Sequence, residues 1–260
     1  FERLMEERIW EFTEKNDCRI RELIEEAGVT RPTALVLLAR DINPDQVHDF
    51  LNPELKNIGD PYCLSGTREA SARLWQAIQE GHRIIIHGDY DTDGITASAL
   101  LAWVLRKNGG NVGCYLPHRI DDGYGLTAES IAKASAGNCD LLLTVDCGIT
   151  SHEAILAAQD INLDLIITDH HTPGPETLNA LAVVDPKLPG SPREIQELAG
   201  VGVAFKVAHA FLKYGREMGF GGEDTDLRQC LDLVALGTVA DIVPLLHENR
   251  ILVKHGLSVL

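Results

Sequence analysis

The sequence predicts an α/β domain in which helices flank a parallel β-sheet, preceded by an N-terminal helical extension. From about residue 67, short apolar runs alternate with amphipathic stretches, which is the pattern of a βαβ chain. The apolar runs are continuous, as expected of strands buried on both faces in a parallel sheet. The length of 260 residues suits one such domain with a small addition. We place the extension at residues 1–60 and the main domain at 61–260.

The extension is expected to form short helices without any chemistry of its own. Its apolar residues recur at three-to-four spacing, first at Leu4, Ile9 and Phe12, then at Ile20, Leu23 and Ile24. A further helix is expected over 33–40, with Pro32 suited to its start. Asn43-Pro44 and Asn52-Pro53 then interrupt the chain.

The main domain reads as an alternation of helices and strands. A helix over 67–80 ends at Gly81, and a helix over 95–107 stops at Asn108-Gly109-Gly110. Further helices are expected over 127–136, 151–158, 201–213 and 226–237. The expected strands are RIIIHG (83–88), VGCYLP (112–117), DLLLTV (140–145), LDLIIT (163–168) and LAVV (181–184).

Composition narrows the class of protein. The first residues, FERLMEERIW, have no apolar signal region, and apolar runs such as LLLTV are too short to cross a membrane. We therefore expect a cytoplasmic protein with no membrane partner. The six cysteines are scattered without a C-x-x-C pair, so we expect buried reduced thiols and neither a zinc cage nor disulfides. The net charge of −16 argues against broad electrostatic capture of nucleic acid, although bound divalent cations would offset it locally.

Acidic and histidine residues follow three of the expected strands. The clusters are HGDYDTDG (87–94), VDCG (145–148) and TDHH (168–171). Ligands bind at the carboxyl ends of strands in open parallel sheets, so the clusters are expected to share one cleft. Two carboxylates about 4 Å apart repel by about 4 kcal/mol at an effective dielectric near 20, which favours a cation between them. Carboxylates with imidazoles suit Mn²⁺ or Mg²⁺, and two ions sharing one aspartate would suit hydrolysis.

Simpler interpretations compete with the metal site. The segment from Asp89 resembles an EF-hand opening, but Leu100 stands where that loop needs an acidic residue, so the EF-hand is rejected. The carboxylates could instead cap helices, which would explain one cluster but not three in series. His170 and His171 alone could be ordinary surface or core histidines. Asp241 follows an expected helix, and its spacing alone favours a cap over a ligand.

Four motifs resemble those of the DHH phosphoesterase family. HGDYDTDG, VDCG, TDHH and ALGTVADIVPL (235–245) occur in the family's order. DDGYGL (121–126) and AGVGVAFKVAHA (199–210) are similar to the members that degrade single-stranded DNA. The resemblance covers about residues 40–260 and implies the DHH phosphoesterase fold with a two-ion Mn²⁺ or Mg²⁺ centre.

The resemblance also implies roles for individual residues. One ion would be held by His87, Asp91 and Asp146, and the other by Asp93, Asp146, His170 and Asp241. By the same resemblance, Asp146 would bridge the ions and His171 would face the scissile phosphate. Asp89 would coordinate or orient a ligand, a choice that stays open, and Asp169 would anchor the histidine loop. The expected catalytic residues are Asp146, Asp169 and His171. Arg119 would hold a neighbouring phosphate, or else form a surface salt bridge.

The implied activity is metal-dependent 5′-to-3′ hydrolysis of single-stranded DNA into 5′ mononucleotides, in repair and recombination. A single-strand-binding protein or a helicase is the expected protein partner of the full-length form. The family's second, substrate-binding domain and an OB-fold are missing from this sequence, which ends in an expected linker helix, ENRILVKHGLSVL. Two alternatives stay open: a DHH enzyme acting on short oligoribonucleotides, cyclic dinucleotides or pyrophosphate, and a catalytically silent replication scaffold.

Overall fold

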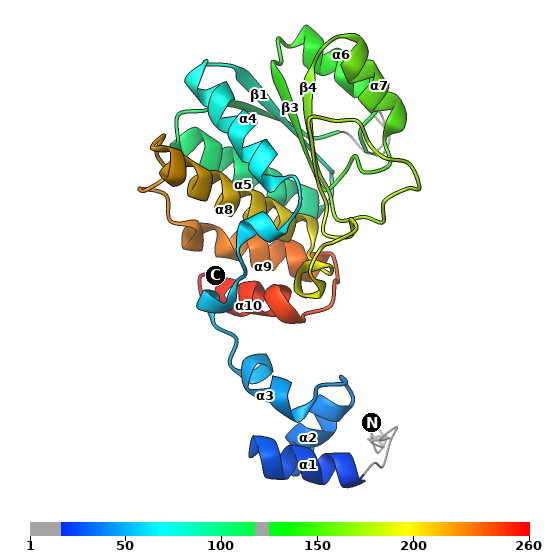
Figure 1. The fold of residues 1–260 in the computed structure, drawn as a ribbon, viewed down its shortest axis with the longest axis vertical. Coiled ribbons are helices and arrows are strands. Elements are labelled where there is room, and N and C mark those ends of the chain that lie inside the picture. Colours follow the sequence, from blue (N-terminus) through cyan, green and yellow to red (C-terminus); the bar gives the residue numbers. More distant parts are fainter. Residues whose placement is uncertain (1–16, 118–124) are drawn as a thin grey trace, which may run out of the picture. The chain divides into compact units, whose positions relative to one another are not determined.

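The computed structural model describes residues 17–117 and 125–260, which divide into two compact units (Figure 1). The first unit ends at Glu54 and the second spans Leu55–Leu260. Arg119, the candidate phosphate ligand, lies outside the described residues, as do Leu4, Ile9 and Phe12 of the extension. The predictions for these four residues therefore stay predictions.

The first unit contains three helices in its described part. They are α1 (Asp17–Ala27), α2 (Arg31–Leu38) and α3 (Pro44–Leu51). Proline stands in the first turn of α2 as predicted. Helix α3 was missed because Asn43-Pro44 looks like a break in the chain. Here the proline opens the helix, and the Asn43 backbone N–H donates to Gln46 Oε1 at 3.0 Å.

The second unit is a parallel sheet covered on both faces, which confirms the predicted fold class. Its five strands, all within the described residues, have the order β2-β1-β3-β4-β5, and each neighbouring pair is parallel. The strands are β1 (Arg83–Gly88), β2 (Asn111–Tyr115), β3 (Leu141–Val145), β4 (Asp164–Thr168) and β5 (Ala182–Val184).

Helices cover the sheet unequally. One face packs against the larger core, which includes residues of α4 (Thr67–Gln79), α5 (Thr92–Lys107), α8 (Gly200–Met218), α9 (Leu231–Ala240) and α10 (His247–Gly256). The other face packs against α6 (Ala128–Ala136) and α7 (His152–Asp160) (Figure 1). None of the described helices is both long and apolar enough to cross a membrane.

Two expectations need correction. We expected every strand to be buried on both faces, and β3 is, but Asn111 and Cys114 of β2 are exposed because β2 is an edge strand. We also expected buried thiols. The cysteines are free as predicted, yet Cys18 and Cys114 are exposed and Cys63 is partly so. An apolar run carries no information about whether its strand lies at an edge, which accounts for Cys114; Cys18 and Cys63 lie outside the sheet.

A buried ion pair fixes α10 to α8. The Lys206 ammonium is fully buried and lies 3.0 Å from Glu248 Oε1. Both groups also bond the backbone of Gly59, whose carbonyl accepts from Lys206 at 2.9 Å and whose N–H donates to Glu248 at 3.0 Å. Because each charge has a charged and a polar partner, neither is buried alone.

Candidate metal centre

The three acidic clusters meet at one edge of the sheet. They follow β1, β3 and β4, which are adjacent and parallel, so their carboxyl ends point the same way. The chain order reverses between β1 and β3, because β2 lies on one side of β1 and β3 on the other. Such a switch point leaves a crevice beyond the strand ends, where ligands bind in folds of this kind.

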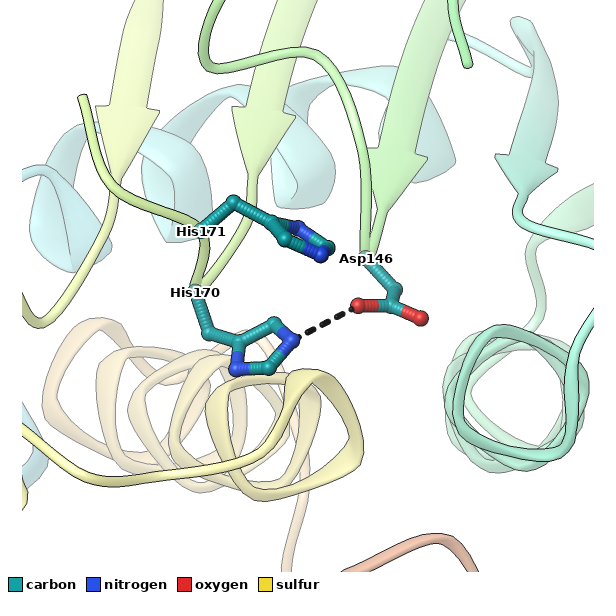
Figure 2. A group of neighbouring side chains, drawn as sticks. All are labelled: Asp146, His170 and His171. Atoms are coloured by element: carbon teal, nitrogen blue, oxygen red, sulfur yellow. Dashed lines mark ion pairs between the residues drawn. The ribbon is translucent and has the colours of Figure 1, made fainter. Parts of the chain in front are cut away.

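The His170 imidazole lies among three carboxylates. Its Nε2 atom is 3.1 Å from Asp146 Oδ1 (Figure 2), 3.9 Å from Asp93 Oδ2 and 3.7 Å from Asp241 Oδ2. These aspartates come from the start of α5, the end of β3 and the residue after α9. The structure therefore brings together four residues that the sequence assigned to one ion by resemblance.

A second group of carboxylates shares Asp146. Ligand atoms of Asp89, Asp91 and Asp146 lie within 4.8 Å of one another, as do those of Asp146, His170 and His171. His87 belongs to none of the metal-sized groups found among the described residues, and its Nδ1 lies 3.7 Å from Cys147 Sγ. The assignment of His87 to an ion stays a prediction, whereas Asp89 does belong to one of these groups.

Asp91 and Asp93 are placed by the start of α5. We expected this helix to begin near Ile95, but it begins at Thr92, because the Asp91 carboxylate caps it by accepting from the Gly94 N–H at 2.9 Å. Asp91 is therefore a helix cap, as the simpler interpretation of the sequence allowed. It also lies in the group with Asp89 and Asp146. Asp93 falls in the first turn of the helix and is buried.

The N-terminus of α8 holds the Asp93 carboxylate. The backbone N–H groups of Gly200 and Val201 donate to its two oxygens at 2.6 and 2.8 Å. The positive end of a helix dipole favours a carboxylate there. Sequence reasoning missed these two donors, because backbone amides leave no side-chain signal. The segment AGVGVAFKVAHA was noticed only through the family resemblance.

Asp146 adopts a backbone conformation that few residues tolerate. Its φ of 60° lies in the left-handed region, where aspartate is more acceptable than most side chains. The carboxylate packs on Gly200, where an added Cβ would lie 2.7 Å from Asp146 Oδ1. A glycine is therefore required at position 200 for this approach. Backbone strain of this kind is concentrated at functional sites.

Asp169 organises the histidine loop. Its Oδ1 accepts from the His170 and His171 N–H groups at 2.7 and 3.1 Å and lies 2.7 Å from His171 Nδ1, while Oδ2 accepts from the Ile149 N–H at 2.9 Å. Burial works to raise the pKa of Asp169, but these bonds outweigh it and the pKa is lowered. The bond to Asp169 is the main cause that raises the pKa of His171 to about 9. His171 is therefore cationic at neutral pH in the absence of metal.

The buried carboxylates of the centre repel one another. Burial, followed by repulsion from neighbouring carboxylates, raises the pKa of Asp93 to about 7 and that of Asp146 to about 9. Asp146 Oδ1 and His170 Nε2 are buried and, apart from their 3.1 Å approach to each other, have no hydrogen-bond partner among the described residues. Buried polar atoms normally have partners, so this donor set fits a cation. Carboxylate oxygens with an imidazole nitrogen suit Mn²⁺ or Mg²⁺.

The chain is similar to known proteins in both sequence and structure. The family model described as "DHH family, N-terminal domain" matches residues 83–238. The single-stranded-DNA-specific exonuclease RecJ of Bacillus subtilis (strain 168) is 38% identical over 96% of this chain and 30% of its own length. Crystal structures of RecJ from Thermus thermophilus in complex with Mn²⁺ and with Mg²⁺ superpose with TM-scores of 0.74 and 0.62, at 34% and 31% identity. Each alignment covers 94% of this chain, and 33% and 30% of those chains. The chain thus spans about a third of the length of these relatives.

Proposed function

The chain belongs to the DHH family, and from this we propose that it is the catalytic core of a metal-dependent phosphodiesterase that degrades single-stranded DNA from the 5′ end. The observation that carries the proposal is the set of three aspartate oxygens within 3.1–3.9 Å of His170 Nε2. Carboxylates this close together inside a protein repel one another unless a cation lies between them. A cation bound there can promote hydrolysis of a phosphate ester.

Two Mn²⁺ or Mg²⁺ ions are the proposed cofactors. The first would be held by His87, Asp91 and Asp146, with Asp89 beside them. The second would be held by Asp93, Asp146, His170 and Asp241. When bound, the ions supply positive charge that stabilises the charge developing on the phosphate during hydrolysis. The crystal structures of RecJ with Mn²⁺ and Mg²⁺ support this choice of ions.

His171 is the proposed contact to the scissile phosphate. Its Nδ1 proton is donated to Asp169, which fixes the ring and favours the cationic form. The ring lies beside Asp146 and His170 (Figure 2), and its side chain keeps 45% of its exposure. An imidazolium that is both anchored and accessible can donate a hydrogen bond to a phosphate oxygen. Asp169 then acts by positioning His171 rather than by touching the substrate.

The substrate proposal is supported by the relatives. Those that match over most of this chain are named single-stranded-DNA-specific exonucleases, at 38–43% identity. The chain itself carries a net charge of −16, so affinity for DNA is expected to depend on the bound cations and on other parts of the full-length protein. We place the full-length enzyme in the cytoplasm, in DNA repair and recombination, with a single-strand-binding protein or a helicase as partner.

Digestion of end-labelled substrates by the full-length protein tests the proposal. A 5′ label on single-stranded DNA should be released as a mononucleotide at once, a 3′ label only late, and a blunt duplex should resist. All cleavage should require Mn²⁺ or Mg²⁺. Asp146→Asn should fold, as judged by circular dichroism, yet lose cleavage. Cleavage of dinucleotides or pyrophosphate in preference to DNA would favour the other DHH activities, and failure to take up Mn²⁺ in calorimetry would favour a silent scaffold.

A further inference from the structure

Ile242 has an unusual backbone conformation next to the metal centre. Its φ is 62°, in the left-handed region. It directly follows Asp241, the C-cap residue of α9, and its N–H bonds the Val239 carbonyl at 3.3 Å. Glycine is the usual residue at this position, because a β-branched side chain clashes with the backbone there. Of the described non-glycine residues with positive φ, Ile242 is the only β-branched one, since the others are Asp, Asn or His.

Packing within this chain does not explain the isoleucine. Its side chain is 87% exposed, which makes it the most exposed large apolar residue in the described part of the chain. Within this chain it therefore gains almost nothing from burial to offset the strain. Glycine would form the same turn without strain. The turn needs position 242 to be left-handed, but it does not need an isoleucine.

The position of Ile242 suggests what its side chain contacts. The Cα atoms of Ile242 and Asp241 are about 3.8 Å apart, as in any trans peptide. The Asp241 carboxylate in turn lies 3.7 Å from His170 Nε2, inside the centre. Val239 and Leu245 are also exposed, at 50% and 39%, so the chain around Asp241 presents several apolar side chains. A phosphate held at the centre would therefore lie close to this segment.

We propose that Ile242 is a substrate-binding residue that packs against the base of the nucleotide adjacent to the scissile phosphate. This inference rests on the proposed function. An aliphatic side chain offers nothing to a phosphate, but it packs well on the face of a base. Bases of a single strand are free to splay out, and apolar side chains such as isoleucine are used elsewhere to separate neighbouring bases. The strain at Ile242 is then retained for substrate contact, at the expense of local stability.

Variants at position 242 of the full-length protein separate substrate contact from folding. Ile242→Gly and Ile242→Asn both suit a left-handed backbone, and each should melt at the wild-type temperature or above. Both should raise KM for single-stranded DNA about fivefold, which corresponds to the lower end of the range of binding energy lost with one base contact. Ile242→Val, which keeps a branched apolar side chain, should stay near the wild type. The control is Met218→Ala, which removes an exposed apolar side chain at the far end of α8, about 27 Å along the helix from Gly200.

A strand with abasic sites at its first two 5′ positions provides a readout that a structural role would not change. The wild type should bind and cleave this strand about fivefold less well than the normal strand, and Ile242→Gly should treat the two alike. Mn²⁺ affinity by calorimetry should be unchanged in all position-242 variants. Equal base discrimination in wild type and Ile242→Gly, or a loss of Mn²⁺ affinity in that variant, would overturn the inference alone. A wild type that neither binds nor cleaves single-stranded DNA would overturn the proposed function and this inference with it.

Discussion

Metal uptake by the centre should release protons. Without a cation, burial and mutual repulsion raise the pKa of Asp146 to about 9 and that of Asp93 to about 7. For a carboxyl with a raised folded pKa, the protonated form is the stable one, so the metal-free fold loses stability as pH rises from the ordinary carboxyl range through these values. A cation reverses the preference, because it binds the ionised carboxylates.

The size of the effect follows from the two pKa values. At pH 7.5 Asp146 should still hold its proton and Asp93 should have lost most of its own, so binding releases roughly one proton. Any loss of the proton on His171 beside the bound ions would add to this number. Metal affinity should consequently rise about tenfold per pH unit between pH 7.5 and 8.5.

Calorimetric titration with Mn²⁺ or Mg²⁺ measures this release directly. The observed enthalpy should change between buffers of different ionisation enthalpy, in proportion to the protons released. Asp226→Asn is a suitable control, because Asp226 is paired with Arg228 outside the centre and its pKa is lowered, so it holds no proton to lose. A metal affinity that does not vary between pH 7.5 and 8.5, with no buffer dependence, would mean that the carboxylates are already ionised and would refute the electrostatic reasoning.

Three further predictions concern other parts of the second unit. Asp169→Asn should lower kcat of the full-length enzyme about 10- to 100-fold through loss of the His171 anchor, and unchanged kcat would contradict that role. Lys206→Met should reduce the free energy of unfolding in urea by about 3–5 kcal/mol, because it leaves Glu248 buried and unpaired. Adding Glu248→Gln should recover part of that loss, and no recovery would argue against an unpaired charge. Burial is the main cause that lowers the pKa of His209 to about 4, so the unfolded chain binds a proton that the fold excludes between pH 6.5 and 4. Stability is lost as pH falls through this window, and His209→Gln should flatten that part of the acid-unfolding curve; an unaltered curve would count against it.

The parallel sheet and the strand-end clusters could be predicted because both are local in the sequence. Buried strands such as β3 are short apolar runs, and the residue after each run marks its carboxyl end. The edge position of β2 could not be predicted, since strand order depends on contacts between distant segments. Helix α3 was missed for a local reason, because Asn-Pro is compatible with a turn and with a helix start alike.

The candidate centre was predicted in part. Asp146 and His170 follow strands, so their convergence could be inferred from the pattern alone. Asp241 entered only through family resemblance, because a carboxylate after a helix is usually a cap. The amides of Gly200 and Val201, more than a hundred residues beyond Asp93, had no signal in the side-chain pattern. Nor did the left-handed backbone of Asp146 and Ile242, which depends on how the surrounding chain constrains each residue.

The bonds from α8 to Asp93 have a consequence for local unfolding. They join the start of α5 to a helix far along the chain, and Asp241 brings the end of α9 to the same spot. An ion bound there would hold all three helix ends at once, so fluctuations that open any one of them would have to release it. Amide hydrogen exchange should then slow together at the ends of α5, α8 and α9 when Mn²⁺ is added, while α6 and α7, on the opposite face of the sheet, keep their own rates.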